Sequence, residues 1–282
     1  LDNVRQIWRL PGTDGRPWRV VSVLGGMFSI DDALKFTRIR TPWDDIGDDG
    51  GTVALARPHE DDWEYWFGGL NSGVWRLRAG HWLQFLPAGA RQPWTVTGLI
   101  EQIDGEGHSW LWAAGNSGLA RFDGEKWTLL PADSGVPAGG YRSVSLIADA
   151  AGRQILWAGS FRHGVVRVDV TNPRAVRVLA DDIPTAPDPT VYSILADSQG
   201  RIYVCTNNGV QQLTPDTDGA YSARVFRRAD GLVHDECNTN SQFIDAHDRY
   251  WVGTLGGLSV HDPRIETQTA TTRPKPILLT DV

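Results

Sequence analysis

The chain has 282 residues, of which 41% are hydrophobic, and a formal net charge of −7. That length and apolar content allow one or two domains with a buried core, and the acidic balance argues against binding to a nucleic-acid backbone. No apolar run reaches the roughly 18–20 residues needed to cross a bilayer.

One phrase, an apolar strand followed by a glycine turn and a second apolar strand, recurs along the chain. It reads VVSVLGGMFSID (20–31), YWFGGLNSGVWRL (65–77), LWAAGNSGLARFD (111–123), LWAGSFRHGVVRVD (156–169), IYVCTNNGVQQL (202–213) and RYWVGTLGGLSVHDP (249–263). Each phrase has one anchor position, in turn Val20, Trp66, Trp112, Trp157, Tyr203 and Trp251. Successive anchors are 46, 46, 45, 46 and 48 residues apart. A period in the forties with several short strands per unit is typical of propeller blades.

Each repeat is expected to contain four strands. In the fourth repeat, residues 142–149 alternate apolar and polar, 155–159 form a nearly continuous apolar run, 165–169 alternate again, and 175–179 close the unit as an outer strand. Outer strands are also expected at 34–39, 81–86, 126–130 and 222–228, whereas the sixth repeat has no clear outer strand. We therefore predict an all-β fold, a β-propeller of about six four-stranded blades over residues 1–264. The ring either closes with six blades or belongs to a larger propeller.

The anchor residues are expected to fill the space between neighbouring blades. A single blade leaves both faces of its sheet exposed, so blades must stack face to face. An indole ring buries roughly 150–250 Å², which suits Trp66, Trp112, Trp157 and Trp251 to that position. The cysteines, Cys205 and Cys237, are interpreted as partly buried bystanders, with a bridge between them left open.

The last fifty residues resemble the final blade of the two-component regulator propellers, the extracytoplasmic part of bacterial hybrid sensor kinases and related receptors. The matching phrases are Asp230-Gly231-Leu232, Glu236-Cys237-Asn238, Trp251-Val252-Gly253-Thr254, Gly257-Leu258, Asp262-Pro263 and Pro276-Ile277-Leu278-Leu279-Thr280-Asp281. His247-Asp248-Arg249 departs from the family's usual x-Gly-Arg at one turn. The other repeats resemble the family more weakly.

This resemblance implies a non-catalytic sensor module in the periplasm, on a receptor of the inner membrane. Residues 265–282 would form a linker toward an immunoglobulin-like domain, with a membrane helix and a signalling output beyond Val282. No signal pattern begins the chain and its single methionine is Met27, so we interpret the sequence as a piece of a longer protein. Any membrane contact would then be made by segments outside this chain.

Ligands of propellers gather where the loops before the first strand and between the second and third strands of each blade meet. Exposed aromatics beside Arg, Asn and His suit a sugar, because a flat ring covers the apolar face of a pyranose while polar groups take its hydroxyls. The candidate ligand-binding residues are Trp43, Trp94, Tyr141, Arg142, Arg162, His163, Asn207, Asn208, His234 and Asn238. The same residues also fit ordinary turn chemistry.

Motifs of known catalytic or cofactor sites do not occur in the sequence, so we expect no cofactor, no metal and no catalytic residue. The expected partner is a small molecule or oligosaccharide, and homodimerisation is left open. Two other functions are considered. A propeller lyase or lactone hydrolase would need carboxylates such as Asp44, Asp45, Asp188 and Asp235 to converge, and a protein-interaction scaffold would present an apolar side.

Overall fold

The computed structural model describes residues 4–45, 51–180 and 182–265. They form six antiparallel sheets in chain order, which we call blades 1 to 6. Blade 1 contains β1 (Val4–Pro11), β2 (Pro17–Val23), β3 (Gly26–Ile30) and β4 (Phe36–Ile39). Blade 2 contains β5 (Gly51–His59), β6 (Asp62–Gly69), β7 (Val74–Arg78) and β8 (His81–Phe85). Blade 3 contains β9 (Val96–Ile103), β10 (Ser109–Gly115), β11 (Gly118–Phe122) and β12 (Trp127–Leu129).

Blades 4 to 6 continue the same order. Blade 4 contains β13 (Tyr141–Ala148), β14 (Gln154–Ser160), β15 (Val165–Asp169) and β16 (Arg177–Val178). Blade 5 contains β17 (Val191–Ala196), β18 (Ile202–Thr206), β19 (Gly209–Pro215) and β20 (Tyr221–Phe226). Blade 6 contains β21 (Cys237–Ile244), β22 (Tyr250–Thr254) and β23 (Gly257–His261). The predicted all-β propeller is confirmed, including a sixth blade without an outer strand among the described residues.

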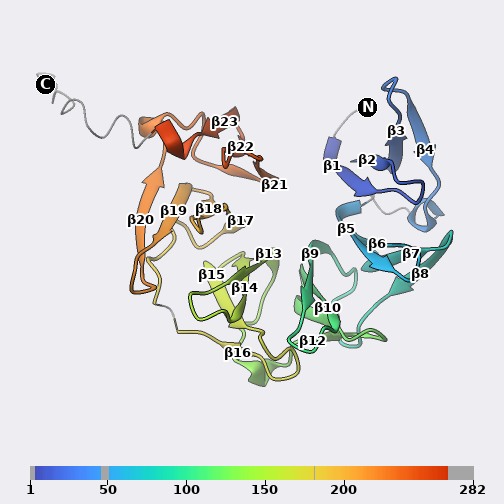
Figure 1. Cartoon of the computed structure of the whole chain (residues 1–282), viewed down its shortest axis with the longest axis horizontal. Helices are drawn as coiled ribbons and strands as arrows, with labels where there is room; N and C mark the ends of the chain where they lie inside the picture. Colours follow the sequence, from blue (N-terminus) through green and yellow to red (C-terminus); the bar gives the residue numbers. More distant parts are fainter. Residues whose placement is uncertain (1–3, 46–50, 181, 266–282) are drawn as a thin grey trace, which may run out of the picture.

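The blades follow one another around a central axis, with the first strand of each nearest to it (Figure 1). Three short 3-10 turns lie in the connections, η1 (Pro42–Asp45), η2 (Ala132–Ser134) and η3 (Arg228–Asp230). Among the described residues, no helix has the length and apolar character needed to cross a membrane. The expected linker at 265–282 lies, apart from Ile265, outside the described residues.

Neighbouring blades are joined by apolar cores that contain the anchor residues. Trp66 packs between blades 2 and 3, Trp112 between blades 3 and 4, and Trp157 between blades 4 and 5. These three side chains are 0–2% exposed, so the expected role of their indoles is confirmed. Trp251 departs from it, because it is only half-buried and lies outside the core between blades 5 and 6.

An aspartate organises the turn after the first strand in blades 3 to 6. Asp104, Asp149, Asp197 and Asp245 each accept hydrogen bonds from the backbone N–H groups two and four residues later. The second oxygen of Asp104 accepts from the indole of Trp110, and that of Asp245 from the indole of Trp251. The aspartate side chain thus fixes the turn by accepting hydrogen bonds from the turn's own backbone.

Acidification is expected to weaken the turn at Asp104. The Trp110 hydrogen bond, with the backbone bonds of His108 and Glu106, lowers the pKa of the Asp104 carboxyl to about 2. A depressed folded-state pKa adds stability above the unfolded value of about 4 that is lost as the pH falls through about 2. Between about pH 4 and pH 2, the melting temperature should therefore fall more steeply in the wild type than in Asp104→Asn. Parallel profiles from scanning calorimetry would contradict the assignment.

The two cysteines form a disulfide between blades 5 and 6, so their interpretation as bystanders is wrong. Cys205 in β18 and Cys237 in β21 have Cα atoms 6.0 Å apart and are 0% and 1% exposed. Spacing in the sequence could not reveal this pair, because 32 residues separate them and only the packing of blade 6 on blade 5 brings them together.

Candidate functional site

The predicted ligand-binding residues come from one end of the propeller, here called the upper end. Because the strands of a blade are antiparallel, the loops before the first strand and after the second strand open at this end. The turns between first and second strands, and between third and fourth strands, open at the lower end. All ten predicted residues lie on upper-end loops or at the adjoining strand ends.

Three of these residues are not exposed, and the expectation that their rings face solvent is wrong. Trp43 and Trp94 are 1% exposed and Tyr141 is 0% exposed. Trp43 packs on Trp75 and Trp82 with ring centroids 5.9 and 5.2 Å apart. The loops that enter blades 2, 3 and 4 fold these aromatics down over the cores between blades, because burying a large ring there stabilises the interface. These rings cap the cores and leave no face for a sugar.

Arg142 is the centre of the side-chain group that the upper end does assemble. Its guanidinium carbon lies 4.1 Å from the ring centroid of Phe161 and 4.6 Å from that of Tyr192. Arg142 is the second residue of β13, Phe161 follows β14 in the same blade, and Tyr192 lies in β17 of the next blade. We call the group the Arg142 cluster; it comprises Arg142, Phe161, Tyr192, Asn207, Glu236 and Thr239.

The charge of Arg142 has aromatic but no carboxylate partners. Its Nη1 donates to Thr239 Oγ1 at 2.9 Å, and its Nε is buried without a hydrogen-bond partner. Burial lowers the pKa of the Arg142 guanidinium. The electrostatic interaction with the Tyr192 phenol acts in the opposite direction and raises it. Within the part of the chain that the structure describes, Arg142 forms no ion pair. A planar cation held between two rings can bind a carboxylate or several hydroxyls, because its remaining N–H groups point in fixed directions.

Tyr192 connects the arginine to the acidic side of the cluster. Its hydroxyl lies 2.6 Å from Asn207 Oδ1 and 3.2 Å from Glu236 Oε1. Burial raises the pKa of the Tyr192 phenol, so this hydroxyl stays protonated at neutral pH and acts as a donor. The cluster therefore offers a cation, a carboxylate and an amide around two aromatic rings.

The remaining predicted residues mainly support the loops. The ring of His163 lies 3.2 Å from the carbonyl of Ala138, and the N–H of Arg162 donates to Ser160 Oγ. His234 Nδ1 accepts from the Glu236 N–H, and Asn238 Nδ2 donates to the Thr254 carbonyl. Asn208 Nδ2 donates to the Pro187 carbonyl. Arg162, His163, Asn208 and Asn238 are exposed, so their roles in ligand binding stay a prediction.

The carboxylates that an enzyme would need are each held within their own loop. Asp44 accepts from the Thr41 N–H at 2.9 Å, Asp188 from the Thr190 N–H at 2.7 Å and Asp235 from the Arg228 N–H at 2.7 Å. Asp45 pairs with Arg40 at 3.4 Å. These bonds explain the four aspartates as turn and surface groups.

The first strands of the six blades line the central channel. A cavity of about 210 Å³ is lined by residues of the six inner strands. The register of β21 shifts between Cys237 and Gln242, and Asn240 there has a φ of 53°. The Asn240 amide donates toward the carbonyls of Thr97 (3.2 Å) and Thr52 (3.4 Å).

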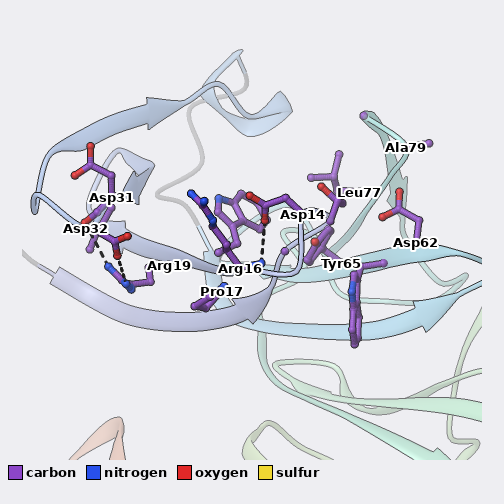
Figure 2. Close-up of a pocket in the computed structure, with 16 residues that line it drawn as sticks. Asp14, Arg16, Pro17, Arg19, Asp31, Asp32, Asp62, Tyr65, Leu77 and Ala79 are labelled. Carbon is purple, nitrogen blue, oxygen red and sulfur yellow. Dashed lines mark hydrogen bonds and ion pairs between the residues drawn. The ribbon is translucent and has the colours of Figure 1, made fainter.

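A larger groove lies at the lower end between blades 1 and 2. It has a volume of about 750 Å³, with Trp18, Trp63 and Tyr65 among its lining residues. Figure 2 shows Asp31 and Asp32 beside Arg19 at one end of the groove, and Asp62 near Ala79 at the other. Arg19 is paired with Asp32 at 2.5 Å. The groove was not among the sequence-based candidates, because its two walls come from different repeats.

A cluster of metal-ligand type also lies at the lower end. Ligand atoms of Asp104, Glu106 and His108 come within 4.8 Å of one another. Asp104 is already engaged by Trp110 and by two backbone N–H groups. The group is therefore explained as a turn.

Sequence reasoning missed Tyr192, Glu236 and Thr239. Tyr192 reads as an ordinary strand residue, and Thr239 falls in the irregular part of β21. A signal existed only for Glu236, which belongs to the Glu-x-Asn phrase beside a predicted loop.

The comparisons with known proteins bear on the repeat and the fold. Residues 185–208 match the family described as "Two component regulator propeller". No curated protein matches the sequence. The extracellular domain of BT4673 from B. thetaiotaomicron is similar with a TM-score of 0.51 and 14% identity over 92% of this chain and 40% of that one. PorZ of the type-IX secretion system of Porphyromonas gingivalis is similar with a TM-score of 0.58 and 15% identity over 87% of this chain and 37% of that one.

A propeller of a different activity is similar as well. The inactive H270A virginiamycin B lyase from Staphylococcus aureus, with quinupristin, gives a TM-score of 0.55 and 14% identity over 93% of this chain and 89% of that one. At such identities the likeness shows the fold alone. The chain spans about two fifths of the length of the BT4673 and PorZ chains. The family match in the fifth repeat, the phrases of the final blade and the six-bladed fold make this chain similar to the two-component regulator propellers.

Proposed function

We propose that this propeller is the extracytoplasmic, ligand-sensing part of a bacterial transmembrane receptor of two-component type. It binds a carbohydrate or another small ligand at the Arg142 cluster and does no chemistry on it. The observation that carries the proposal is the arginine held between Phe161 and Tyr192 without a carboxylate partner in the described chain. Such a group costs desolvation energy in the free protein, which a bound acceptor would offset.

Two further observations support the location and the role. The Cys205–Cys237 disulfide suits an oxidising compartment such as the periplasm, because cytosolic thiols are kept reduced. The family match and the likeness to the extracellular domain of BT4673, named for a hybrid two-component system, agree with a sensor. Blades 4, 5 and 6 all contribute to the cluster, so a bound ligand would contact three blades at once.

The ligand should be found by screening short uronic-acid and neutral oligosaccharides for a rise in melting temperature. For the best binder, Arg142→Ala is expected to weaken the affinity by about 10- to 150-fold in calorimetric titration. That range corresponds to losing one hydrogen bond to a charged group, at about 1.5–3 kcal/mol. Arg142→Lys should also bind poorly, because an ammonium lacks the planar fork.

Arg174→Lys is the matched control, since Arg174 also stacks on an aromatic ring, Trp110, at 5.0 Å but lies at the lower end. If Arg142→Ala and Arg174→Lys both bound the ligand with the wild-type affinity, the Arg142 cluster would be rejected as the binding site.

A propeller lyase is the second candidate, which the virginiamycin B lyase fold brings into consideration. The two functions are separated by incubating the best binder with the protein and following it by mass spectrometry. A sensor returns the ligand intact, whereas turnover that is lost in Glu236→Gln would establish the enzyme.

A further inference from the structure

The groove at the lower end between blades 1 and 2 has the size and the aromatic lining of a ligand site. Its volume of about 750 Å³ falls within the roughly 300–1,000 Å³ of small-molecule pockets. Trp18 and Trp63 in its lining are half-buried, and Tyr65 is 6% exposed. The ring centroids of Trp18 and Tyr65 lie 5.0 Å apart in an edge-on arrangement, so aromatic surface from both blades meets inside the groove.

Carboxylates outnumber cations along this groove. Its lining includes four aspartates and two arginines, namely Asp14, Asp31, Asp32, Asp62, Arg16 and Arg19. Arg19 is already paired with Asp32 (Figure 2). Among the described residues, no side-chain cation forms an ion pair with Asp14 or Asp62. The groove therefore carries an excess of negative charge.

The carboxylates of Asp14 and Asp62 act on the aromatic part of the groove. In Figure 2 both lie toward Tyr65 and away from Asp31. Burial raises the pKa of the Tyr65 phenol, and the charges of Asp62 and Asp14 raise it further. The hydroxyl therefore stays protonated at neutral pH, and it donates to the carbonyl of Pro11 at 2.8 Å. A ligand resting on these rings would lie in a negative potential.

The other blades show which chemical group covers an aromatic ring at this place. In blades 2, 3 and 4 the third strand has an arginine directly opposite the anchor residue. The pairs are Arg76 opposite Trp66, Arg121 opposite Trp112 and Arg167 opposite Trp157. Each guanidinium carbon lies 5.3–5.7 Å from the ring centroid of a tryptophan on the same face, which is the distance of a cation–π contact.

Blade 1 has the tryptophan without the arginine. Trp18 stands two residues before the anchor Val20, as Trp110 does before the anchor of blade 3. The residue opposite Val20 is Ser29, which has no charge to place over an indole. Among the described residues, no cation–π contact involves Trp18 or Trp63. The guanidinium that covers Trp110 thus has no counterpart over Trp18.

We propose that the groove binds a small organic cation, an ammonium or guanidinium group carried on an apolar chain or a sugar ring. The charged group would lie over Trp18, where the other blades place an arginine, with Asp14 and Asp62 as counter-charges. The body of the ligand would pack on the remaining aromatic surface. The groove lies at the opposite end of the propeller from the Arg142 cluster, so this site does not depend on the function proposed for that cluster.

Matched cationic and neutral probes test the charge of the ligand. A glucosamine tetramer, its N-acetylated form and agmatine are titrated into the protein by calorimetry, at low salt and at a mildly acidic pH that keeps the sugar amines protonated. The glucosamine tetramer should bind at least about 10-fold more tightly than the acetylated tetramer. Agmatine should also bind, and the affinity of both cations should fall as salt is added.

Substitutions then test whether the cation lies in the groove. Asp14→Asn with Asp62→Asn removes both counter-charges and should weaken agmatine binding by about 3- to 10-fold, as for partly exposed charge pairs. Ser29→Arg gives blade 1 the guanidinium of blades 2 to 4. It should weaken binding by at least about 10-fold, because the protein's own cation then covers Trp18. Asp61→Asn, which is exposed and outside the groove lining, is the matched control and should bind as the wild type does.

Four results would overturn the proposal. Binding of the acetylated tetramer as tight as that of the glucosamine tetramer would show that no cation is selected. Failure of both cationic probes to bind at millimolar concentration would show that the protein has no such site. Wild-type affinity in the folded Ser29→Arg and double aspartate variants would place the cation outside the groove. Equal weakening in Asp61→Asn and in the double variant would reduce the effect to the net charge of the protein.

Discussion

Replacing Trp157 with alanine is expected to lower the free energy of unfolding by about 3–5 kcal/mol. The indole is 2% exposed, packs edge-on against Tyr221 at 5.9 Å and lies under the guanidinium of Arg167 at 5.3 Å. Its removal would leave a cavity between two sheets whose spacing is held by the turns around them. The sheets could therefore move together only slightly, and most of the cavity would remain. Denaturant unfolding followed by circular dichroism measures the loss.

Trp251→Ala supplies the matched comparison, because Trp251 occupies the same place in its repeat but lies half-buried on the open face of blade 6. We expect a clearly smaller loss there in residues 1–282. If Trp157→Ala unfolded at the wild-type denaturant concentration, the interface role of the anchor residues would be refuted. If the two variants lost equal stability, the distinction between covered and open faces would fail.

Removing the disulfide is expected to cost about 3–4 kcal/mol, the value for a cross-link that closes a loop of about this length. The bond spans 32 residues and joins β18 to β21. Blade 6 has three strands and one covered face in the described chain, so it depends on this tie more than an inner blade would. The double variant Cys205→Ala with Cys237→Ala avoids leaving a free thiol in the core.

Hydrogen exchange read by mass spectrometry should locate this loss. Amides of β21 and β22 should exchange faster in the double variant, while those of β9 and β10 in blade 3 should exchange at the wild-type rate. Equally faster amide exchange in blades 3 and 6 would indicate global unfolding. In that case the loss of stability would not be confined to blade 6. Unchanged exchange everywhere would show that the bond adds nothing to the packing of blade 6.

The proposed binding site is harder to predict than the blades, and its residues show why. Arg142, Asn207 and the loops that hold them were identified, because turn residues stand at fixed places in a repeat. Trp43, Trp94 and Tyr141 were assigned to the surface, although the loops fold them over the cores. Tyr192 was missed because a strand pattern does not distinguish a tyrosine inside the core from one at its edge.

The sequence by itself determined the repeat, the four-stranded unit and the position of the anchor residues, because strand alternation and turn chemistry act over a few residues. Packing decided the rest: the Cys205–Cys237 bond, the grouping of Phe161 and Tyr192 around Arg142, and the half-buried position of Trp251 on blade 6. These features join residues from different blades. Their relative positions depend on how the sheets stack around the axis, a property that the short period of the sequence pattern does not contain.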